Sequence, residues 1–447
     1  MLDLAAIFIT LTTILTWINY RFMKLPPAIG VMANALLLSV MIQIADMMGY
    51  PYLKEISVKF LMNIDFSEVL MTWFLPALLF AGSLHVNLKD LSIYKWPIGL
   101  LATCGIVVST FVIGYSAHYM LALFGWNISI YYCLAFGALI SPTDPIAVMG
   151  ILKTTGTPKP LRMTIIGESL ANDGTAVVVF GILLGIIALG HEPTALDVTV
   201  LFLHEGIGGL IFGGIIGLVG FLMLRTIDQH QVSVMLTFAM VFGGSALASK
   251  LHVSSPISMV VAGLILGNYS RNIVMSENSR RYVDSVWEII DDCLNALLFV
   301  LIGLELLILP FSWMHVAAAT ALSVVVLVAR FLTIGPAIMI LRGKHLGGRQ
   351  IDRGAIRILT WGGLRGGISV ALALSLPVSP ERDLILVLTY IVVLTSILLQ
   401  GLTIGKMVKV LYGEKKRPPT AYEIETAALA AAEAEAEAHA ENAARNH

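Results

Sequence analysis

Runs of about 20 apolar residues, the length that a helix needs to cross the hydrocarbon of a bilayer, recur along the whole chain. Short polar segments separate them, so the pattern leaves no room for an inserted water-soluble domain. It predicts thirteen membrane-spanning helices, at residues 3–23, 25–47, 65–84, 97–124, 128–152, 160–189, 201–225, 231–250, 254–269, 285–308, 312–341, 355–378 and 382–407. The expected fold is therefore an all-α polytopic membrane protein.

The two ends of the chain differ from each other. Residues 3–23 follow no basic leader and precede no small-residue cleavage site, so we expect a retained span rather than a signal peptide. After about Tyr412 the sequence becomes polar and then rich in Ala and Glu. We therefore expect a transmembrane domain over 1–410 and a short cytoplasmic tail over 411–447, helical or disordered.

Composition agrees with a chain that lies mostly in lipid. Of 447 residues, 57% are hydrophobic and 13% are charged, about half the charged share of a soluble domain. The net charge of −1 gives no indication of a nucleic-acid partner. Cys104, Cys133 and Cys293 lie in or beside apolar stretches without metal-ligand spacing, so we expect buried thiols and no bound cofactor.

The loops between the predicted spans differ in their content of Lys and Arg. Of the 28 basic residues, 22 lie in alternate loops and in the C-terminal segment, four lie in the other loops, and two lie inside spans. Basic residues are enriched in cytoplasmic loops. The bias predicts a cytoplasmic C-terminus and, with thirteen spans, an N-terminus on the outside.

Charged residues fall inside several predicted spans, among them Asp144, Glu168, Asp173, Arg330 and Arg365. A charge at the centre of a spanning helix costs roughly 2.5–3.5 kcal/mol on insertion scales. Such residues usually pair with one another or line the path of an ion. The functional chemistry should therefore be sought here.

The fifth predicted span contains Pro142 and Pro145, which bracket Thr143 and Asp144. Proline removes a backbone donor and clashes with the preceding turn, so this helix should be interrupted. An interruption frees carbonyls and amides that can meet an ion. A simple proline kink, with Asp144 accepting from a freed amide, is an equally open interpretation.

The sixth predicted span carries Glu168, Ser169, Asn172 and Asp173 within an arc of about 140° at 100° per residue. Two carboxylates, an amide and a hydroxyl are therefore expected to project into one place at mid-depth. Oxygen ligands of this kind suit a hard cation such as Na⁺. The alternative is polar contact between helices, which rarely needs two carboxylates.

In the twelfth predicted span four glycines surround Arg365 and should loosen the middle of the helix. If the seventh span is a linker, the chain divides into two six-helix halves of opposite orientation. The interrupted fifth span and this glycine-rich span are then the fifth members of the two halves. Matching broken helices in inverted repeats are a pointer to the central site of a transporter.

At these residues the chain resembles a known superfamily. The motifs SPTDP, GESLANDGT, VARFL and WGGLRGG together resemble the monovalent cation/proton antiporters, and in particular the first branch, the NhaP-type Na⁺/H⁺ antiporters related to animal sodium/proton exchangers. The Asn172–Asp173 pair is similar to the electroneutral branch, whereas two adjacent aspartates mark the electrogenic one. One departure is Ala81, where many relatives carry an acidic residue.

The resemblance implies a role for each intramembrane residue. Asp173 would be the principal carboxylate that binds Na⁺, with Ser169 and Thr143 as further oxygen ligands. Asp144 would tune the site or hold the broken helix, and Asn172 would occupy the place of the second aspartate. Glu168 would pair with Arg330, and Arg365 would stabilise the broken twelfth helix. A purely structural role for both arginines is equally open.

The function implied is secondary active exchange of Na⁺, or Li⁺, for protons by alternating access, with an expected one-to-one ratio and a role in pH homeostasis. The moving core would comprise residues around 97–190 and 312–407, and the other helices would form a scaffold and a homodimer interface in the inner membrane. Cation and proton would compete for Asp173, because burial disfavours the charged form and a nearby cation favours it.

Other classes of function remain to be compared. A K⁺/H⁺ antiporter of the same fold is the main alternative. A channel would need a continuous pore and a repeated filter segment, and an organic-solute carrier would more often show aromatic residues near the breaks. No nucleotide motif suggests a pump or another enzyme.

A further acidic group, Glu288, Asp291 and Asp292, lies near the expected cytoplasmic end of the tenth predicted span. Its charge could attract cations toward the site. A solvated helix end is the simpler interpretation.

Overall fold

A helix begins at nearly every position where the hydropathy pattern predicts one. The structure, a computed structural model, describes residues 2–62, 68–93, 95–144, 148–149, 152, 157–189, 194–270, 275–309, 312–342 and 353–413. All the regular elements in these ranges are helices, which confirms the predicted all-α class. Residues 414–447 of the expected tail over 411–447 and Pro145 lie outside the described residues.

The α-helices have the following bounds. They are α1 (Leu2–Ile18), α2 (Pro27–Met47), α3 (Pro51–Met62), α5 (Leu75–Leu84), α6 (Leu88–Ile93), α7 (Lys95–Leu100), α8 (Ile106–Leu123), α9 (Ile130–Ile140), α11 (Lys159–Leu189), α12 (Ala195–Leu201), α13 (Gly208–Leu224), α14 (His230–Phe238), α15 (Gly244–Lys250), α16 (Ser255–Ile265), α18 (Glu277–Glu305), α19 (Trp313–Arg342), α20 (Arg353–Trp361), α21 (Gly367–Leu374), α22 (Pro380–Thr395) and α23 (Gly401–Tyr412). Wider π-helical turns continue several of them: η1 (Asn19–Met23), η2 (Val69–Phe74), η3 (Leu101–Gly105), η4 (Phe202–Ile207), η5 (Ala239–Gly243), η6 (Leu266–Ser270) and η7 (Ser396–Gln400).

Eight helices in the described part of the chain are long and apolar enough to cross a membrane. Three shorter apolar helices occupy Val69–Leu84, Ile130–Ile140 and Ser255–Tyr269. The two remaining predicted spans correspond to α18 and to the pair α20 and α21. The chain is therefore a multi-pass membrane protein, whereas the count of thirteen crossings and the inverted repeat stay predictions.

The pattern missed some boundaries for physical reasons. Helix α18 begins at Glu277, eight residues before the predicted start of the tenth span, with Ser276 as its N-cap. Its first turns are charged, which hides them from a search for apolar runs. Helix α3 was not predicted because Lys54 and Lys59 interrupt its apolar residues; it packs beside α2, where Lys54 Nζ lies 2.7 Å from Asp46 Oδ2.

The prediction that all three thiols are buried was wrong for two of them. Cys133 is buried, whereas Cys104 and Cys293 are exposed on the surface of the chain. On the apolar surface of a membrane protein an exposed small residue faces lipid or another subunit rather than water. Apolar neighbours in the sequence therefore do not distinguish a thiol buried inside the protein from one exposed on its surface.

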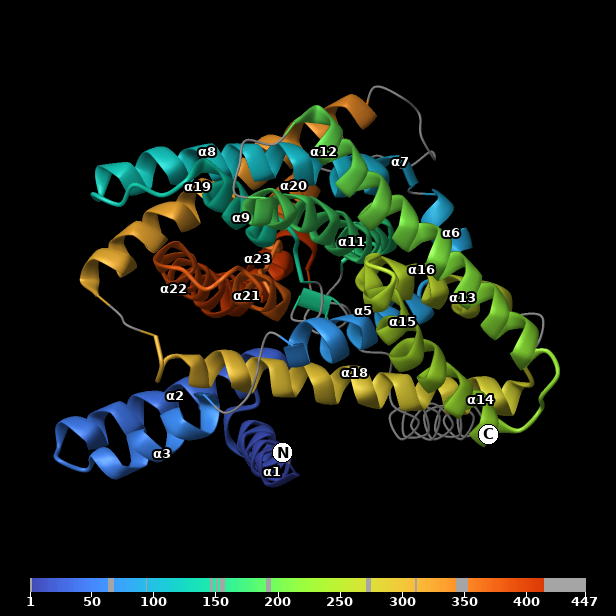
Figure 1. Ribbon diagram of the computed structural model, residues 1–447, viewed down its shortest axis with the longest axis horizontal. Coiled ribbons are helices and arrows are strands. Elements are labelled where there is room, and N and C mark those ends of the chain that lie inside the picture. Colours follow the sequence, from blue (N-terminus) through green and yellow to red (C-terminus); the bar gives the residue numbers. More distant parts are fainter. Residues whose placement is uncertain are drawn as a thin grey trace, which may run out of the picture.

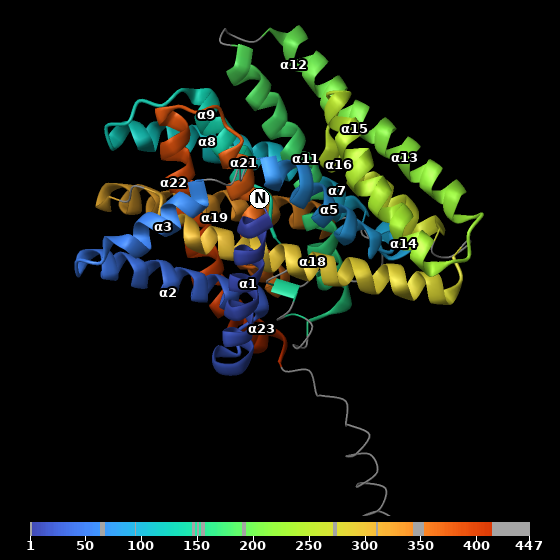
Figure 2. The same ribbon diagram turned by 60° about the horizontal axis from the view of Figure 1, so that its bottom comes forward.

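Helix α18 runs across one side of the molecule and connects its two ends (Figures 1 and 2). Near its C-terminus Ser39 Oγ of α2 donates to Gly303 O at 2.8 Å. Near its N-terminal half the buried Trp287 donates through Nε1 to Thr237 Oγ1 of α14 at 2.9 Å and packs on Phe80 of α5. These contacts hold α2, α5 and α14 to one long helix. In Figure 1, α1–α3 lie on one side of α18, and α8, α9, α11 and α19–α22 lie on the other.

Helices α13 and α16 approach each other through glycines. The backbones are close enough that a Cβ at Gly213 would lie 2.5 Å from Ser258 O, and Ser258 Oγ donates to Gly209 O at 3.1 Å. Small residues at such spacing allow close packing where lipid provides no hydrophobic driving force. Gly214, the next residue, faces open space.

We predict that Gly213→Ala lowers the stability of the protein, because the added methyl group must push against the backbone of α16. Overpacking of this kind costs about 1–3 kcal/mol. Gly214→Ala is the matched control, with the same chemical change on the same helix and no neighbour within 4 Å. Thermal unfolding in detergent should show a lower Tm for the first variant only; equal Tm values would contradict the close contact.

Candidate functional site

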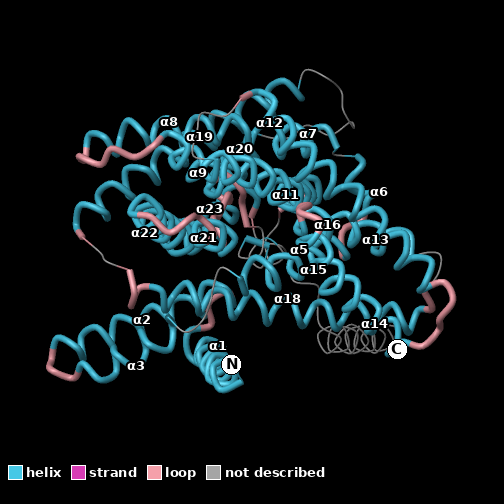
Figure 3. The backbone as a smooth tube through the Cα atoms, in the orientation of Figure 1, coloured by secondary structure: helices cyan, strands magenta, loops and turns pink. Residues whose placement is uncertain are grey.

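Two helices are interrupted in the interior of the molecule, as the sequence predicted. Helix α9 ends at Ile140, and the chain continues without helical structure from Ser141 to Asp144. Helix α20 ends at Trp361, and α21 begins only at Gly367. The two interruptions touch, since the amide of Asp144 donates to Leu364 O at 2.8 Å. Figure 3 shows these short loop segments surrounded by helices.

Arg365 connects the two interruptions by its side chain. Its guanidinium donates through NH1 to Ser141 O and Pro142 O, the second at 2.7 Å, although the residue itself belongs to the break between α20 and α21. The carbonyls at a helix C-terminus carry partial negative charge, which a cation stabilises. From the sequence we expected Arg365 to stabilise the break in its own helix, the twelfth predicted span. In the structure its side chain binds the carbonyls at the break in the fifth predicted span.

Asp144 lies beside the N-terminus of a helix, whereas Arg365 binds carbonyls at a helix C-terminus. A Cβ built at Gly366 would lie 2.5 Å from Asp144 Oδ2, so the carboxylate lies directly against the residue that precedes α21. The amides at a helix N-terminus favour negative charge. We call the place where the two interruptions meet the crossing. There the Arg365 guanidinium binds carbonyls at one helix end, and the Asp144 carboxylate lies beside the N-terminus of another helix.

Glu168 and Arg330 form a buried ion pair, with 2.6 Å between Glu168 Oε1 and Arg330 NH1. The side chains are 2% and 9% exposed, so water contributes little to the solvation of either charge. Arg330 Nε also donates to Leu359 O in the last turn of α20 at 3.3 Å. The pair that the family motif suggested thus joins α11 to α19 and to the end of α20.

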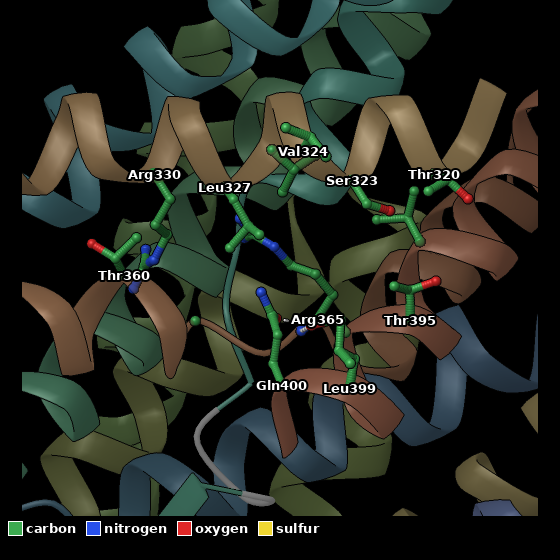
Figure 4. Close-up of a pocket in the computed structure, with 14 residues that line it drawn as sticks. Thr320, Ser323, Val324, Leu327, Arg330, Thr360, Arg365, Thr395, Leu399 and Gln400 are labelled. Carbon is green, nitrogen blue, oxygen red and sulfur yellow. Dashed lines mark hydrogen bonds between the residues drawn. The ribbon is translucent and has the colours of Figure 1, made fainter. Parts of the chain in front are cut away.

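Both arginines border one cavity of about 130 Å³ between α19 and η7. Figure 4 shows Arg330 beside Thr360 and Arg365 beside Gln400 in this cavity. The backbone amide of Arg365 donates to Ser396 Oγ at 3.0 Å, and that hydroxyl donates to Gln400 Oε1 at 2.6 Å. The described lining contains no carboxylate, so this cavity is not a candidate cation site.

A different cavity, also of about 130 Å³, lies on the other side of the crossing. Its described polar lining consists of Asp144, Ser169, Asp173, Asp291 and Asn295; the other described lining residues are apolar or glycine. Asp173 is 7% exposed, and within the described residues it makes no hydrogen bond or ion pair. Three carboxylates without a basic neighbour in the described lining make this cavity the candidate site for a cation or for protons.

The four polar residues of α11 do not all face this cavity, contrary to the expectation from the helical arc. Ser169 and Asp173 face it, whereas Glu168 turns to Arg330. Asn172 is fully buried and donates through Nδ2 to Thr143 Oγ1 at 3.0 Å. An arc of 140° is wide enough for different neighbours at its two edges, and the sequence does not reveal those neighbours.

Thr143 lies behind the cavity rather than in its described lining. Its hydroxyl accepts from Asn172, and its carbonyl accepts from Ser169 Oγ. In this conformation the hydroxyl and the carbonyl oxygen of Thr143, a residue expected to bind Na⁺, therefore both accept hydrogen bonds from α11. The contacts fix the interrupted segment to α11 and orient Ser169 beside Asp173.

The two residues of α18 in the lining, Asp291 and Asn295, were not expected at the site. Asp291 lies at the middle of α18 rather than near its end, because that helix begins earlier than predicted. A signal was present, since an aspartate four residues before an asparagine places both on one helix face. The apolar pattern alone could not show which helix face meets the cavity.

Comparison with known proteins gives a consistent result. Residues 7–410 match the family model described as sodium/hydrogen exchanger, transmembrane. The chain is 65% identical over 412 residues to the Na⁺/H⁺ antiporter NhaP of Pseudomonas aeruginosa, covering 92% of this chain and 97% of the relative. It is 34% identical over 369 residues to the Na⁺/H⁺ antiporter NhaH of Halobacillus aidingensis, covering 80% and 87%.

The fold is also similar to a solved structure. The sodium proton antiporter MjNhaP1 from Methanocaldococcus jannaschii, solved at pH 8, superposes with a TM-score of 0.69 over 92% of this chain and 98% of that one. The identity between the two is 17%, so this likeness concerns the fold alone.

We predict that Glu168→Gln and Arg330→Gln each destabilise the protein strongly, because either leaves a buried charge without its partner. The expected loss is about 3–5 kcal/mol for each single variant, and the double variant should lose less than the sum. The exposed pair Glu277 and Arg281 is the control, since such i,i+4 pairs contribute roughly 0.3–0.5 kcal/mol. Thermal unfolding of all variants measures both cycles; additive losses at the buried pair would point to another partner, such as Arg365.

Proposed function

The chain belongs to the transmembrane sodium/hydrogen exchanger family, and we propose that it exchanges Na⁺ for protons at Asp173 by alternating access. The observation that carries the assignment of the site is the cavity in which Asp173, Asp144 and Ser169 meet without a basic side chain in the described lining. Carboxylate and hydroxyl oxygens suit a hard monovalent cation. The family consists of transporters, and we propose no enzymatic reaction for this chain.

Competition between Na⁺ and a proton for one buried carboxylate accounts for the coupling of their transport. A carboxylate in a poorly solvated cavity is stabilised either by binding a proton or by a nearby cation. Na⁺ therefore displaces the proton, and a proton displaces Na⁺. An empty site would move an unbalanced charge past lipid, which is costly, so the occupied forms are the ones that cross.

The moving group consists of α11 with the two interrupted helices, which carry Asp144, Ser169 and Asp173. Contacts through Arg365, Thr143 and Asp144 join these helices to one another and support motion as one unit. Helix α18 and the helices fixed to it form the scaffold. We further propose a homodimer through scaffold helices in the inner membrane, with the N-terminus outside and the C-terminus in the cytoplasm, as the basic residues of the loops favour.

Transport of K⁺ in place of Na⁺ is the nearest alternative. The two cations would use the same oxygens and differ in ligand distance and number. A channel is disfavoured because the polar lining ends at a buried carboxylate between packed helices.

We predict that Asp173→Asn abolishes exchange while the protein still folds, since the amide can neither hold the exchanged proton nor balance a cation. Purified protein in vesicles with an imposed pH gradient should respond to Na⁺, and Li⁺, K⁺ and choline define the selectivity. Asp383→Asn is the matched control, because this aspartate is 63% exposed at the start of α22. Wild-type exchange by the Asp173 variant would remove this residue from the mechanism.

We predict a one-to-one exchange that moves no net charge. Asn172 bears no charge, and Glu168 is neutralised by Arg330, so α11 offers one exchanging carboxylate. A membrane potential acts on net charge moved, at about 2.3 kcal/mol per charge per 100 mV, and should not affect the end-point. Vesicles clamped with K⁺ and valinomycin measure this. An end-point that shifts with the clamped potential would mean that a second carboxylate, such as Asp144, exchanges protons too.

A further inference from the structure

The cavity at Asp173 is formed by two groups of helices that carry different polar side chains. Asp144, Ser169 and Asp173 come from α11 and the crossing, whereas Asp291 and Asn295 come from α18. Asn295 Nδ2 donates to Asp291 Oδ1 at 3.1 Å and to Asp291 O at 2.8 Å. This pair of bonds holds the asparagine one turn above the carboxylate and fixes both on the cavity side of the helix.

Asp173 and Asp291 bring carboxyl groups from two groups of helices to one cavity whose described lining contains no basic side chain. Asp144 lies near enough to both Asp173 and Asp291 for their charges to repel. The described lining supplies no basic group, and Asp173 is more than nine-tenths buried without a partner among the described residues. A cation between Asp173 and Asp291 would relieve this repulsion from both sides.

Helix α18 is held to the scaffold helices by hydrogen bonds, whereas against the crossing it packs through the apolar Leu298 side chain beside Gly367. Its contacts with α2 through Gly303 and with α14 through Trp287 lie on both sides of Asp291 along the helix. If the crossing moves against the scaffold, as proposed above, Asp291 does not move with Asp173. The two carboxylates then face one cavity in the conformation described here and separate in the other.

We propose that Asp291, oriented by Asn295, is a scaffold-side cation ligand that contributes to Na⁺ binding from one face of the membrane only. The proposal rests on the exchange function proposed above. It implies that the affinity for Na⁺ differs between the two faces, although the mobile half of the site is the same in both.

The position of the cavity identifies the face. Val86, Ile166 and Leu170 in its lining lie toward the helix ends that lead to Lys89 and Arg162. Those ends belong to the basic loops that are expected in the cytoplasm. Asp291 should therefore act on Na⁺ that enters from the cytoplasm.

The test measures the half-saturating Na⁺ concentration separately on each face, in everted and in right-side-out vesicles. Asp291→Asn should raise it by about tenfold on the cytoplasmic face, which corresponds to ~1.4 kcal/mol, and leave the outer value unchanged. Asp291→Glu should restore much of the affinity. Asp292→Asn is the matched control, since the neighbouring aspartate is exposed and does not line the cavity. Asn295→Ala should give a smaller change of the same sidedness, and it serves as a second variant should Asp291→Asn not fold.

Equal changes on both faces, or no change on either, in Asp291→Asn and Asn295→Ala alike would overturn the proposal. A merely structural role for Asp291 would lower the maximal rate on both faces without this asymmetry. Failure of the wild-type protein to exchange Na⁺ at all would instead refute the proposed function. The two failures are therefore distinguishable.

Discussion

Two unwound segments cross in the interior, and the helix ends that meet there leave backbone groups without an intrahelical partner. In a membrane no bulk water can satisfy them, so protein groups must do so. The amide of Asp144 donates to Leu364 O, and Arg365 donates to the carbonyls that follow α9. The site depends on these hydrogen bonds between the two segments, because the same contacts position Asp144 at the edge of the cavity.

The crossing also explains why the two arginines are not equivalent. Arg330 has a carboxylate partner, Glu168, and serves mainly to join three helices. Arg365 is bound to carbonyl oxygens, and its described contacts include no carboxylate within ion-pair distance. Its charge is thus balanced by helix dipoles, which leaves the carboxylates on the far side of the crossing available for a transported ion.

Much of this arrangement could be predicted from the sequence, since its causes are local. Pro142 and the glycines around Arg365 interrupt their helices by backbone chemistry alone. The charges of Glu168 and Arg330 are too costly to bury singly, so the pairing of intramembrane charges was expected on physical grounds, and the family resemblance indicated the partners. The helices themselves followed from apolar runs of sufficient length.

The features that could not be predicted depend on which faces of the helices pack against each other. Thr143 accepts hydrogen bonds from α11 where free ligand oxygens were expected, and Asp291 faces the site where a solvated helix end was expected. Both outcomes follow from the rotation and tilt of packed helices. Hydropathy and spacing within one segment contain no information on either quantity.

The glycines of the WGGLRGG segment lie against three separate neighbours. A Cβ at Gly363 would lie 2.4 Å from Arg330 Nε, one at Gly366 would lie 2.5 Å from Asp144 Oδ2, and one at Gly367 would lie 2.3 Å from the Leu298 side chain. A larger residue at any of them requires a shift or a compensating change of a side chain from another segment. Divergence of this short segment is therefore constrained by its neighbours, so it should drift far more slowly than the lipid-facing helices around it.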